Sequence, residues 1–246
     1  MRRNFTLKMH DYIHRPEGKR KFNEEMFSEI APRYDFITRA LSFGRDKKWK
    51  DGLAAKLPEI KSPNCLDLAC GTGDLTFRLA RRYGQGHIVG LDLTEAMLEL
   101  ARGRNSFGNV EFVIGQMSQT GFSDESFDIV TGGYALRNAP DLKSALQEIR
   151  RVMKPGGTGA FLDFSKPPNR LLQRGENMML KTWGGFWGLA LHRNAELYTY
   201  IAESLKQFPD SSQLKGHLEE IGFRNIRSKK HFLGMTETII FNKISI

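Results

Sequence analysis

The strongest constraint on the fold is a pattern that begins at residue 64, where short apolar runs alternate with amphipathic helical stretches. Five runs have the length and composition of buried strands, namely residues 64–69, 87–92, 110–114, 127–132 and 157–164. Three stretches have helical spacing, namely residues 74–83, 94–103 and 140–153. Such alternation is typical of a parallel sheet covered by helices on both faces. With a helix near 210–221 and strands near 223–230 and 236–242, we predict an α/β fold with a doubly wound, seven-stranded, mostly parallel sheet.

Two segments lie outside this alternation. Residues 1–50 contain 13 Lys and Arg against 7 Asp and Glu, so they carry +6 of the formal charge of +9. Apolar residues recur among these charges at three- and four-residue spacing, which predicts a basic, helical N-terminal extension. Residues 51–246 then form one main domain. Its pattern breaks at Lys166-Pro167-Pro168 and resumes in a segment rich in Met, Trp, Phe and Gly, so we expect a helical lid over the sheet at about 166–205.

The composition is that of an ordinary globular protein, with 40% hydrophobic and 26% charged residues over 246 positions. Two cysteines, Cys65 and Cys70, cannot form a disulfide framework, and no apolar stretch of the secretory type follows the basic N-terminus. The longest continuous apolar-plus-glycine run, Trp183–Leu191, has nine residues, against about 20 in a membrane-spanning helix. We therefore expect a cytoplasmic protein without a transmembrane segment. The six histidines form no cluster with metal-ligand spacing, so no metal site is expected.

The first predicted strand ends in a glycine turn that leads directly into a helix. Gly71 and Gly73 allow the backbone to turn tightly and to approach a ligand closely. Asp92 closes the second strand 21 residues after Gly71, where a carboxylate can accept hydrogen bonds from ribose hydroxyls. Strand, turn, helix, strand and acid together predict a nucleoside-binding half-fold.

The charges around this turn indicate which nucleoside is bound. Dinucleotide enzymes have a third glycine where this chain has Thr76, and Asp67 and Asp74 would repel a pyrophosphate. A cationic ligand without phosphate fits better, and S-adenosylmethionine has both properties. Charge complementarity with the helix N-terminus and hydrogen bonding within the loop are the alternative roles for Asp67 and Asp74.

The adenine of such a ligand would lie at the end of the third strand, where Gln116 offers an amide oxygen and Met117 an apolar face. A plain loop is the alternative for this pair. The residues expected to bind S-adenosylmethionine on these grounds are Asp67, Gly71, Thr72, Gly73, Asp92, Leu93, Gln116 and Met117.

Together these stretches resemble the class I S-adenosylmethionine-dependent methyltransferases, and more narrowly the ubiquinone/menaquinone C-methyltransferase family. The resemblance spans about residues 22–225. Four further segments carry the narrower match: Tyr34–Ser42 followed by Trp49, Tyr134–Asn138, Arg151–Pro167 and Tyr198–Pro209.

The resemblance implies a Rossmann-like fold, S-adenosylmethionine as cofactor, and methylation of a ring carbon of a polyprenylated quinol in menaquinone or ubiquinone biosynthesis. It also adds Gly133 to the expected cofactor site, since the family often has a Ser there. Thr38, Asp46, Gln116 and Gly133 depart from the family pattern, as does the C-terminal strand. The sequence therefore leaves open whether the lipid-soluble quinol is a naphthoquinol or a benzoquinol, and whether the chain forms a homodimer.

The expected chemistry needs a positive charge near the acceptor. A quinol carbon becomes nucleophilic when the neighbouring hydroxyl loses its proton, and the phenolate then needs a cation or donor. Arg137 follows the fourth strand at the ligand-binding edge of the sheet and stays cationic, so it is the candidate, with Asn138 orienting it. A surface ion pair is the alternative for Arg137, and helix capping for Asn138, which lies just before Pro140 and Asp141.

His192, Tyr198 and Tyr200 are candidates for contact with the quinol hydroxyls or for the general base, with core packing as the alternative. Asp163, at the end of the fifth strand, is placed similarly. Apolar residues of both segments outside the sheet would form a lid and a tunnel for the polyprenyl tail, or simply core: Trp183, Phe186, Trp187, Leu189, Leu191, Phe22, Met26, Phe27 and Tyr34. The basic N-terminal segment would then make peripheral contact with an anionic membrane surface.

Three other functions compete with methylation of a quinol. Nucleic acid is not expected as a partner, because the chain lacks an Asn/Asp-Pro-Pro-Tyr tetrapeptide and a cysteine away from the first strand and its turn. A C- or O-methyltransferase of another small phenolic acceptor fits the same residues. A non-catalytic, methyltransferase-like subunit of a quinone-biosynthesis complex is suggested by the departures at Gln116 and Gly133.

Overall fold

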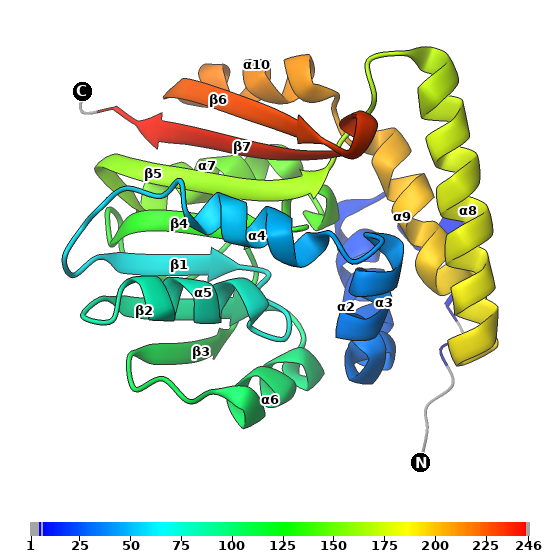
Figure 1. The fold of residues 1–246 in the computed structure, drawn as a ribbon, viewed down its shortest axis with the longest axis horizontal. Coiled ribbons are helices and arrows are strands. Elements are labelled where there is room, and N and C mark those ends of the chain that lie inside the picture. The colour runs from blue at the N-terminus through cyan, green and yellow to red at the C-terminus, as the bar shows by residue number, and fades with distance from the viewer. Residues whose placement is uncertain (1–4, 6, 245–246) are drawn as a thin grey trace.

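A single seven-stranded sheet organises the fold, in the order β3-β2-β1-β4-β5-β7-β6 (Figure 1). The structure is a computed structural model and describes residue 5 and residues 7–244. The strands are β1 (Asn64–Leu68), β2 (His87–Asp92), β3 (Val110–Ile114), β4 (Phe127–Gly133), β5 (Met153–Phe164), β6 (Phe223–His231) and β7 (Thr236–Lys243). β7 runs antiparallel to both of its neighbours, and the other pairs are parallel. The predicted doubly wound, mostly parallel sheet is confirmed.

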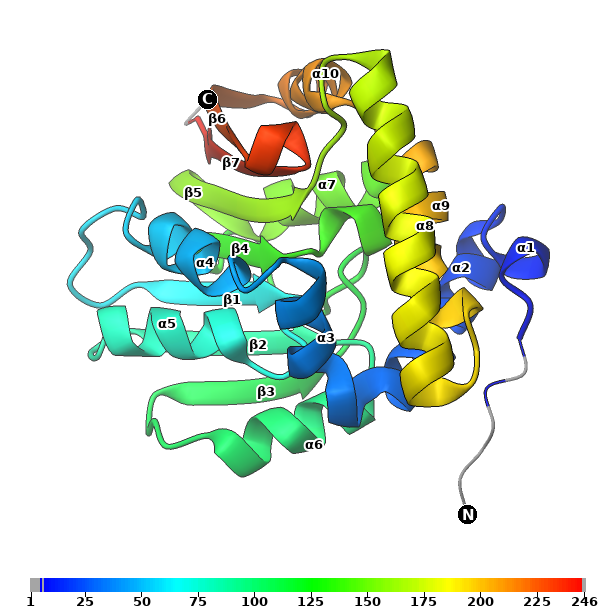
Figure 2. The same cartoon turned by 45° about the vertical axis from the view of Figure 1, so that its right-hand side comes forward.

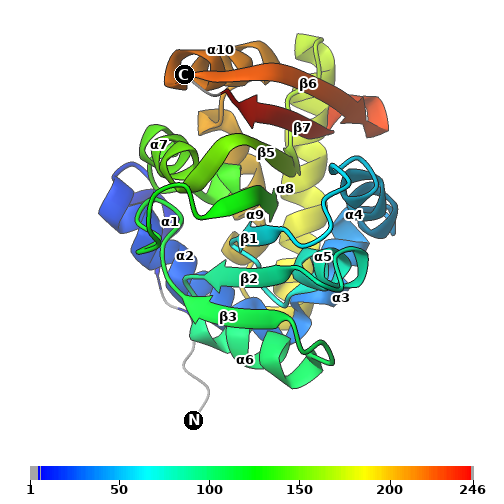
Figure 3. The ribbon, with the colours of Figure 1, turned by 90° about the vertical axis from the view of Figure 1, so that its left-hand side faces the viewer.

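Helices cover both faces of this sheet. The helices of the alternating region are α5 (Asp74–Arg82), α6 (Glu95–Arg104), α7 (Leu142–Val152) and α10 (Ser211–Ile221). In Figure 3, α5 lies on one side of the sheet and α7 on the other. The alternation of β1 explains this: Cys65 packs in the core under α5, whereas Leu66 and Leu68 pack in the core under α7.

The helix after β4 shows where local sequence reasoning was right and where it was wrong. Its N-cap is Asp141, whose carboxylate accepts a hydrogen bond from the Ser144 backbone N–H at 2.9 Å. The capping role considered for Asn138 is therefore wrong. The helix ends at Val152, and β5 begins immediately at Met153, which pairs with Phe127. The predicted start of this strand at residue 157 was late because the glycines there suggested a loop.

The remaining helices belong to the N-terminal extension and the insertion: α1 (Met9–Tyr12), α2 (Pro16–Ile30), α3 (Tyr34–Leu41), α4 (Asp46–Ala54), α8 (Arg170–His192) and α9 (Glu196–Gln207). Three short 3₁₀ turns complete the chain: η1 (Ala31–Arg33), η2 (Leu136–Asn138) and η3 (Phe232–Gly234). Helices α2, α3, α8 and α9 gather at the end of the sheet toward which β1 points (Figures 1 and 2). The domain boundary predicted at residue 50 falls inside α4, which packs against α5 and β5.

The extension and the insertion share a third hydrophobic core, separate from the two cores of the sheet. Phe22 of α2 packs on Tyr200 of α9, with ring centroids 5.5 Å apart. Polar contacts then tie α2 to the turn after β4, because Lys19 Nζ donates to the carbonyls of Arg137 and Ala139 at 2.9 and 2.7 Å. Within residue 5 and residues 7–244, no helix is long and apolar enough to cross a membrane.

Candidate functional site

The glycine turn after β1 has the backbone that its sequence predicts. Gly71 and Gly73 have φ values of +56° and +82°, in the left-handed region that favours glycine. The turn brings the Gly71 N–H to Asp92, whose Oδ2 accepts a hydrogen bond at 2.7 Å. It thus joins the carboxyl ends of β1 and β2.

Asp92 is buried at the centre of this edge. Its Oδ1 accepts a second hydrogen bond, from the Thr94 backbone N–H at 2.9 Å. Burial raises the pKa of the Asp92 carboxyl, while the backbone hydrogen bonds from Thr94 and Gly71 oppose the rise. Each carboxylate oxygen can accept two hydrogen bonds, so Asp92 keeps acceptor capacity for ribose hydroxyls.

Three predicted cofactor residues, Asp67, Thr72 and Gly73, do not line the cavity that the turn borders. Asp67 is fully buried, and its two oxygens accept hydrogen bonds from Thr76 at 2.7 Å and Thr131 at 2.8 Å. Burial raises the pKa of Asp67 to about 6. The Thr72 hydroxyl donates a hydrogen bond to Asp35 of α3 at 2.6 Å, and Gly73 is the N-cap of α5. These residues hold the shape of the turn, and direct cofactor contact by them stays a prediction.

A cavity of about 680 Å³, part of which is open to solvent, lies in front of the turn. The predicted cofactor residues on its wall are Gly71, Asp92, Leu93, Gln116, Met117 and Gly133. Sequence reasoning missed further wall residues: Arg20, Asn23, Ala69, Leu91, Thr94, Met97, Gly115 and Pro140. Of these, Asn23 had a usable signal, since it precedes Phe27 by one helical turn on the predicted amphipathic helix.

This wall contains polar atoms that need a partner. Asn23 Oδ1 and Asn138 Oδ1 are both buried and accept no hydrogen bond from any described residue. Their amide nitrogens are used, since Asn23 donates to the Asn138 carbonyl and Asn138 donates to the Tyr134 carbonyl, each at 2.8 Å. Burying an unpaired acceptor costs roughly 1 to 3 kcal/mol, so these oxygens are poised for a ligand. An amine and ribose hydroxyls are the donors that S-adenosylmethionine offers, and the wall therefore fits this cofactor.

A second cavity of about 540 Å³ adjoins the first. Four residues belong to both walls, namely Phe27, Tyr34, Tyr134 and Asn138. The rest of its wall is mainly apolar and comes from α2, α3 and α9, with Met26, Ile37 and Leu197 as examples. An apolar methyl acceptor bound in the second cavity would therefore lie next to a ligand bound in the first, beside the four shared residues.

Arg137 is the cation of the second cavity. Its side chain is buried and forms an ion pair with Asp163, with Nε and Oδ1 3.6 Å apart. The guanidinium lies over the rings of Phe164 and Tyr200, and Nη1 donates to the Ser204 hydroxyl. The alternative of a surface ion pair is wrong, because Asp163 is itself buried and also accepts from the Arg137 backbone N–H at 3.0 Å. Burial raises the pKa of Asp163, and Arg137 opposes that rise.

The tyrosines and the histidine of the insertion occupy different places. Tyr200 and Tyr198 both line the second cavity, and the Tyr200 hydroxyl is buried without a partner among the described residues. Burial raises the pKa of Tyr200 to about 12. His192 lies behind Tyr198, with Nε2 2.9 Å from the Tyr198 hydroxyl and Nδ1 3.5 Å from Glu29 Oε1. Burial lowers the pKa of His192 and raises that of Tyr198.

The predicted aromatic tunnel is only half right. Met26, Phe27 and Tyr34 of the extension do line the second cavity. The aromatic side chains of α8 do not, because α9 stands between much of α8 and the cavity and supplies the wall itself. Trp183, Phe186 and Trp187 instead pack on one another. Within the described part of the chain, no group of three His, Cys, Asp or Glu residues could hold a metal ion.

Comparison with known proteins adds an independent line of evidence. Residues 16–242 match the family model described as the ubiE/COQ5 methyltransferase family. A demethylmenaquinone methyltransferase of Lactobacillus johnsonii is 37% identical over 85% of this chain and 88% of its own length. The 2-phytyl-1,4-naphtoquinone methyltransferase of Thermosynechococcus vestitus is 37% identical over 83% and 91%. The ubiquinone/menaquinone biosynthesis C-methyltransferase UbiE of Francisella tularensis is 35% identical over 85% and 86%.

Solved structures agree with the fold. A chain of the complex between the Haloferax volcanii Trm112 methyltransferase activator and a methyltransferase has a TM-score of 0.66 at 17% identity, with 89% of this chain and 98% of that chain covered. A phosphoethanolamine N-methyltransferase of Haemonchus contortus, in complex with S-adenosylmethionine, has a TM-score of 0.63 at 13% identity, with 98% and 61% covered.

Proposed function

The chain belongs to the ubiE/COQ5 methyltransferase family, and from this premise we propose that it methylates a ring carbon of a polyprenylated quinol in respiratory quinone biosynthesis. It is a methyltransferase, and its cofactor is S-adenosylmethionine. The observation that carries the proposal is the pair of adjoining cavities. One lies against the glycine turn and Asp92, and the other is apolar and contains a buried arginine.

The first cavity supports binding of the cofactor through this chain's own groups. Asp92 would accept hydrogen bonds from the ribose, Gln116 and Met117 would border the adenine, and the unpaired oxygens of Asn23 and Asn138 would accept from the remaining donors. When bound, S-adenosylmethionine supplies an electrophilic methyl group that an acceptor carbon takes by in-line displacement. Holding the reacting groups in line can contribute up to about 7 to 11 kcal/mol, so positioning by the shared wall is the main task of the protein.

Arg137 stabilises the acceptor in its reactive form. Its fixed positive charge favours the phenolate over the phenol, and Asp163 holds the guanidinium in place through the ion pair. Lys19 adds positive charge nearby, since its ammonium binds the Arg137 carbonyl. Burial lowers the pKa of Lys19 to about 8, so most of its charge is kept at neutral pH.

Tyr198, His192 and Glu29 support a route for the proton that the acceptor loses. Tyr198 lines the acceptor cavity, and its hydroxyl contacts the His192 ring. A neutral imidazole can accept a proton at this point, and Glu29 on the far side of the ring is about one-third exposed to solvent. Tyr200, with its unpaired hydroxyl, is the candidate to bind the second quinol oxygen.

Two naphthoquinone methyltransferases are among the relatives at 37% identity, which favours a naphthoquinol ring. The test incubates the purified chain with S-adenosylmethionine labelled in its methyl group and with reduced demethylmenaquinol or the demethylated benzoquinol precursor, each in detergent. Asp92→Ala serves as the negative control for cofactor binding. We expect label in the naphthoquinol product. Label in neither lipid, with cofactor binding demonstrated, would refute the quinol as substrate and favour another phenolic acceptor.

The proposal includes peripheral contact with an anionic membrane surface, because the polyprenyl tail of such an acceptor resides in the bilayer. Among the described residues, no helix suits a membrane span, so the enzyme would meet its acceptor at the lipid surface. A homodimer is the other partner that the sequence leaves open, and light scattering of the purified chain tests it.

A further inference from the structure

We propose that the exposed side of α8, together with residues 36–48, is a docking face that binds the surface of an anionic lipid bilayer. This inference deepens the proposed function, which requires an acceptor with a lipid tail. It assigns the membrane contact to α8 and to the last part of the basic N-terminal segment predicted above, and not to the first helices of that segment.

The first observation is a row of exposed apolar side chains along α8. Leu171, Met178, Phe186 and Leu189 are 73%, 66%, 55% and 58% exposed. They are seven, eight and three residues apart, which places them on one side of the helix. Monomeric soluble proteins rarely expose a contiguous apolar surface of this kind without a binding partner.

Helix α8 is not packed loosely, so it cannot rotate to bury this row of side chains. The opposite side of α8 carries Gly184 and Gly188, and a Cβ atom at these positions would lie 2.9 Å from the Tyr198 carbonyl oxygen and 2.4 Å from that of Asn194. Close contact with the backbone of α9 and its preceding loop therefore fixes the rotation of α8. The apolar row is held outward by the packing of its own inner side.

Aromatic side chains extend the apolar surface onto residues 36–48. Phe43 is 49% exposed and stacks on Trp183 of α8, with centroids 6.3 Å apart. Phe36 is 52% exposed and packs edge-on against Trp187 at 5.2 Å. Aromatic side chains that are in contact with water on one side and with apolar groups on the other are favoured at the membrane interface.

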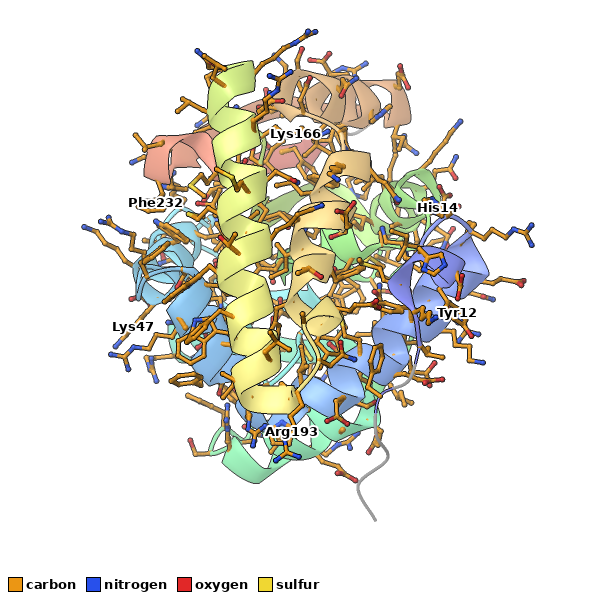
Figure 4. The ribbon with its side chains drawn as sticks, turned by 90° about the vertical axis from the view of Figure 1, so that its right-hand side faces the viewer. Tyr12, His14, Lys47, Lys166, Arg193 and Phe232 are labelled. Atoms are coloured by element: carbon orange, nitrogen blue, oxygen red, sulfur yellow. The ribbon has the colours of Figure 1, made fainter. Side chains whose placement is uncertain are left out.

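The charges on the docking face have one sign. Exposed residues within 36–48 and 170–193 include eight cations and no acid, because the two acids of these ranges, Asp46 and Glu176, are buried. The cations are Arg39, Arg45, Lys47, Lys48, Arg170, Arg174, Lys181 and Arg193. Only Lys181 forms an ion pair with another described residue, Glu203. Figure 4 faces α8, with Lys47 beside it and Arg193 at its lower end.

Charge favours a bilayer over a second copy of the chain as the occupant. Two copies related by a twofold axis would bring like charges together, whereas anionic headgroups neutralise them and acyl chains cover the apolar row. The part of the N-terminal segment that precedes α3 is a poorer candidate. Its helix α2 exposes Glu17, Glu24 and Glu25 among its basic residues, and it buries Phe22 and Met26 in the core.

The docking face also lies close to the acceptor cavity. Helix α3 contributes Phe36 to the docking face, while Ile37, Thr38 and Leu41 of the same helix line the cavity. One helix therefore separates the lipid from the site where a quinol ring would bind.

The test measures binding of the full chain to vesicles of phosphatidylglycerol and phosphatidylcholine, by flotation at low and high salt. Phe186→Ser/Leu189→Ser removes half of the apolar row, and Lys47→Glu/Lys48→Glu reverses two cations. The matched control is Ile60→Ser/Lys61→Glu, an exposed pair in the loop before β1. Circular dichroism establishes that each variant is folded.

We expect the charge variant to bind at least about 30-fold more weakly, since the loss of each cation near an anionic surface costs roughly fivefold and the two new carboxylates add repulsion. The apolar variant should also bind more weakly, and the control should bind like wild type. Methyl transfer to a short-tailed acceptor in detergent should be the same in all of them, so loss of vesicle binding is separable from failure of the proposed function. Unchanged vesicle binding in both face variants would overturn the proposal. So would a concentration-dependent dimer that only these two variants abolish, because the face would then bind a second copy.

Discussion

Replacement of Asp163 by Asn tests whether the cation of the acceptor cavity depends on its buried partner. The substitution keeps the shape of the side chain and removes its charge, which leaves the Arg137 guanidinium buried without a counterion. The two carboxylate oxygens of Asp163 accept hydrogen bonds from the backbone N–H groups of Arg137 and Phe164. In asparagine one of these oxygens becomes an NH₂ group, which cannot accept, so one of the two hydrogen bonds is lost. Breaking a buried pair on one side costs about 3 to 5 kcal/mol, a large share of the ordinary stability of a domain.

Urea unfolding of the purified chain measures this cost, and a double-mutant cycle with Arg137→Met isolates the pair. At about 2 to 4 °C per kcal/mol for a chain of this size, Asp163→Asn should lower the melting temperature by roughly 6 to 20 °C. The double variant should lose less stability than the sum of the single variants, because no isolated charge then remains. Additive losses, or a loss for Asp163→Asn below about 1 kcal/mol, would refute the view that the pair holds Arg137.

Three further predictions follow from the same contacts. Arg137→Met should lower kcat about 100- to 1000-fold while the Kd for S-adenosylmethionine stays unchanged, because one stabilising donor is lost only in the reacting state; Arg151→Met, at a surface ion pair, is the control. Asp92→Ala should raise the Kd for S-adenosylmethionine at least 100-fold, because it removes two hydrogen bonds to a charged group that contribute about 1.5 kcal/mol each. Calorimetry measures this Kd, and Asp141→Ala, which removes only a helix cap, should leave it unchanged. Burial raises the pKa of Glu176 from 4.5 to about 8, so the unfolded chain releases this proton first and stability should fall as pH rises from 4.5 toward 8. In melting curves across that range Glu176→Gln should lack this fall, and an identical pH dependence in both proteins would contradict the assignment.

The fold could be predicted from the sequence because its signals are local. Each of the strands β1 to β5 contains a short apolar run, and the turn that contains Gly71 needs a residue with positive φ. Asp92 follows from the same reasoning, since its place at the end of β2 puts it beside that turn in any parallel arrangement of β1 and β2. These features depend on residue type and spacing within about 30 positions, and they require no knowledge of how distant segments pack.

The residues that the sequence could not place are those whose partners lie far along the chain. Asp67 seemed available to a ligand, yet Thr131, 64 residues away, occupies one of its oxygens. Arg137 seemed free to pair at the surface, yet Asp163 meets it from the neighbouring strand. The aromatic residues of α8 have the composition of a tunnel, yet Phe186 is exposed and Trp183 and Trp187 pack beside it, while α9 supplies the wall of the cavity. Contacts of this kind are set by tertiary structure, and residue spacing does not encode them.

Helix α3 connects the three surfaces on which the function depends. At its start, Tyr34 belongs to the wall of both cavities, and Asp35 accepts from Thr72 of the glycine turn and pairs with Arg104. In its middle, Ile37 faces the acceptor cavity while Phe36 faces outward on the docking face. A helix of eight residues that contacts the glycine turn, the acceptor cavity and the proposed docking face cannot shift against one of them without disturbing the others. A methylated, lipid-tailed product that left past α3 would therefore also loosen the cover over the glycine turn, and release of the two products would then be coupled.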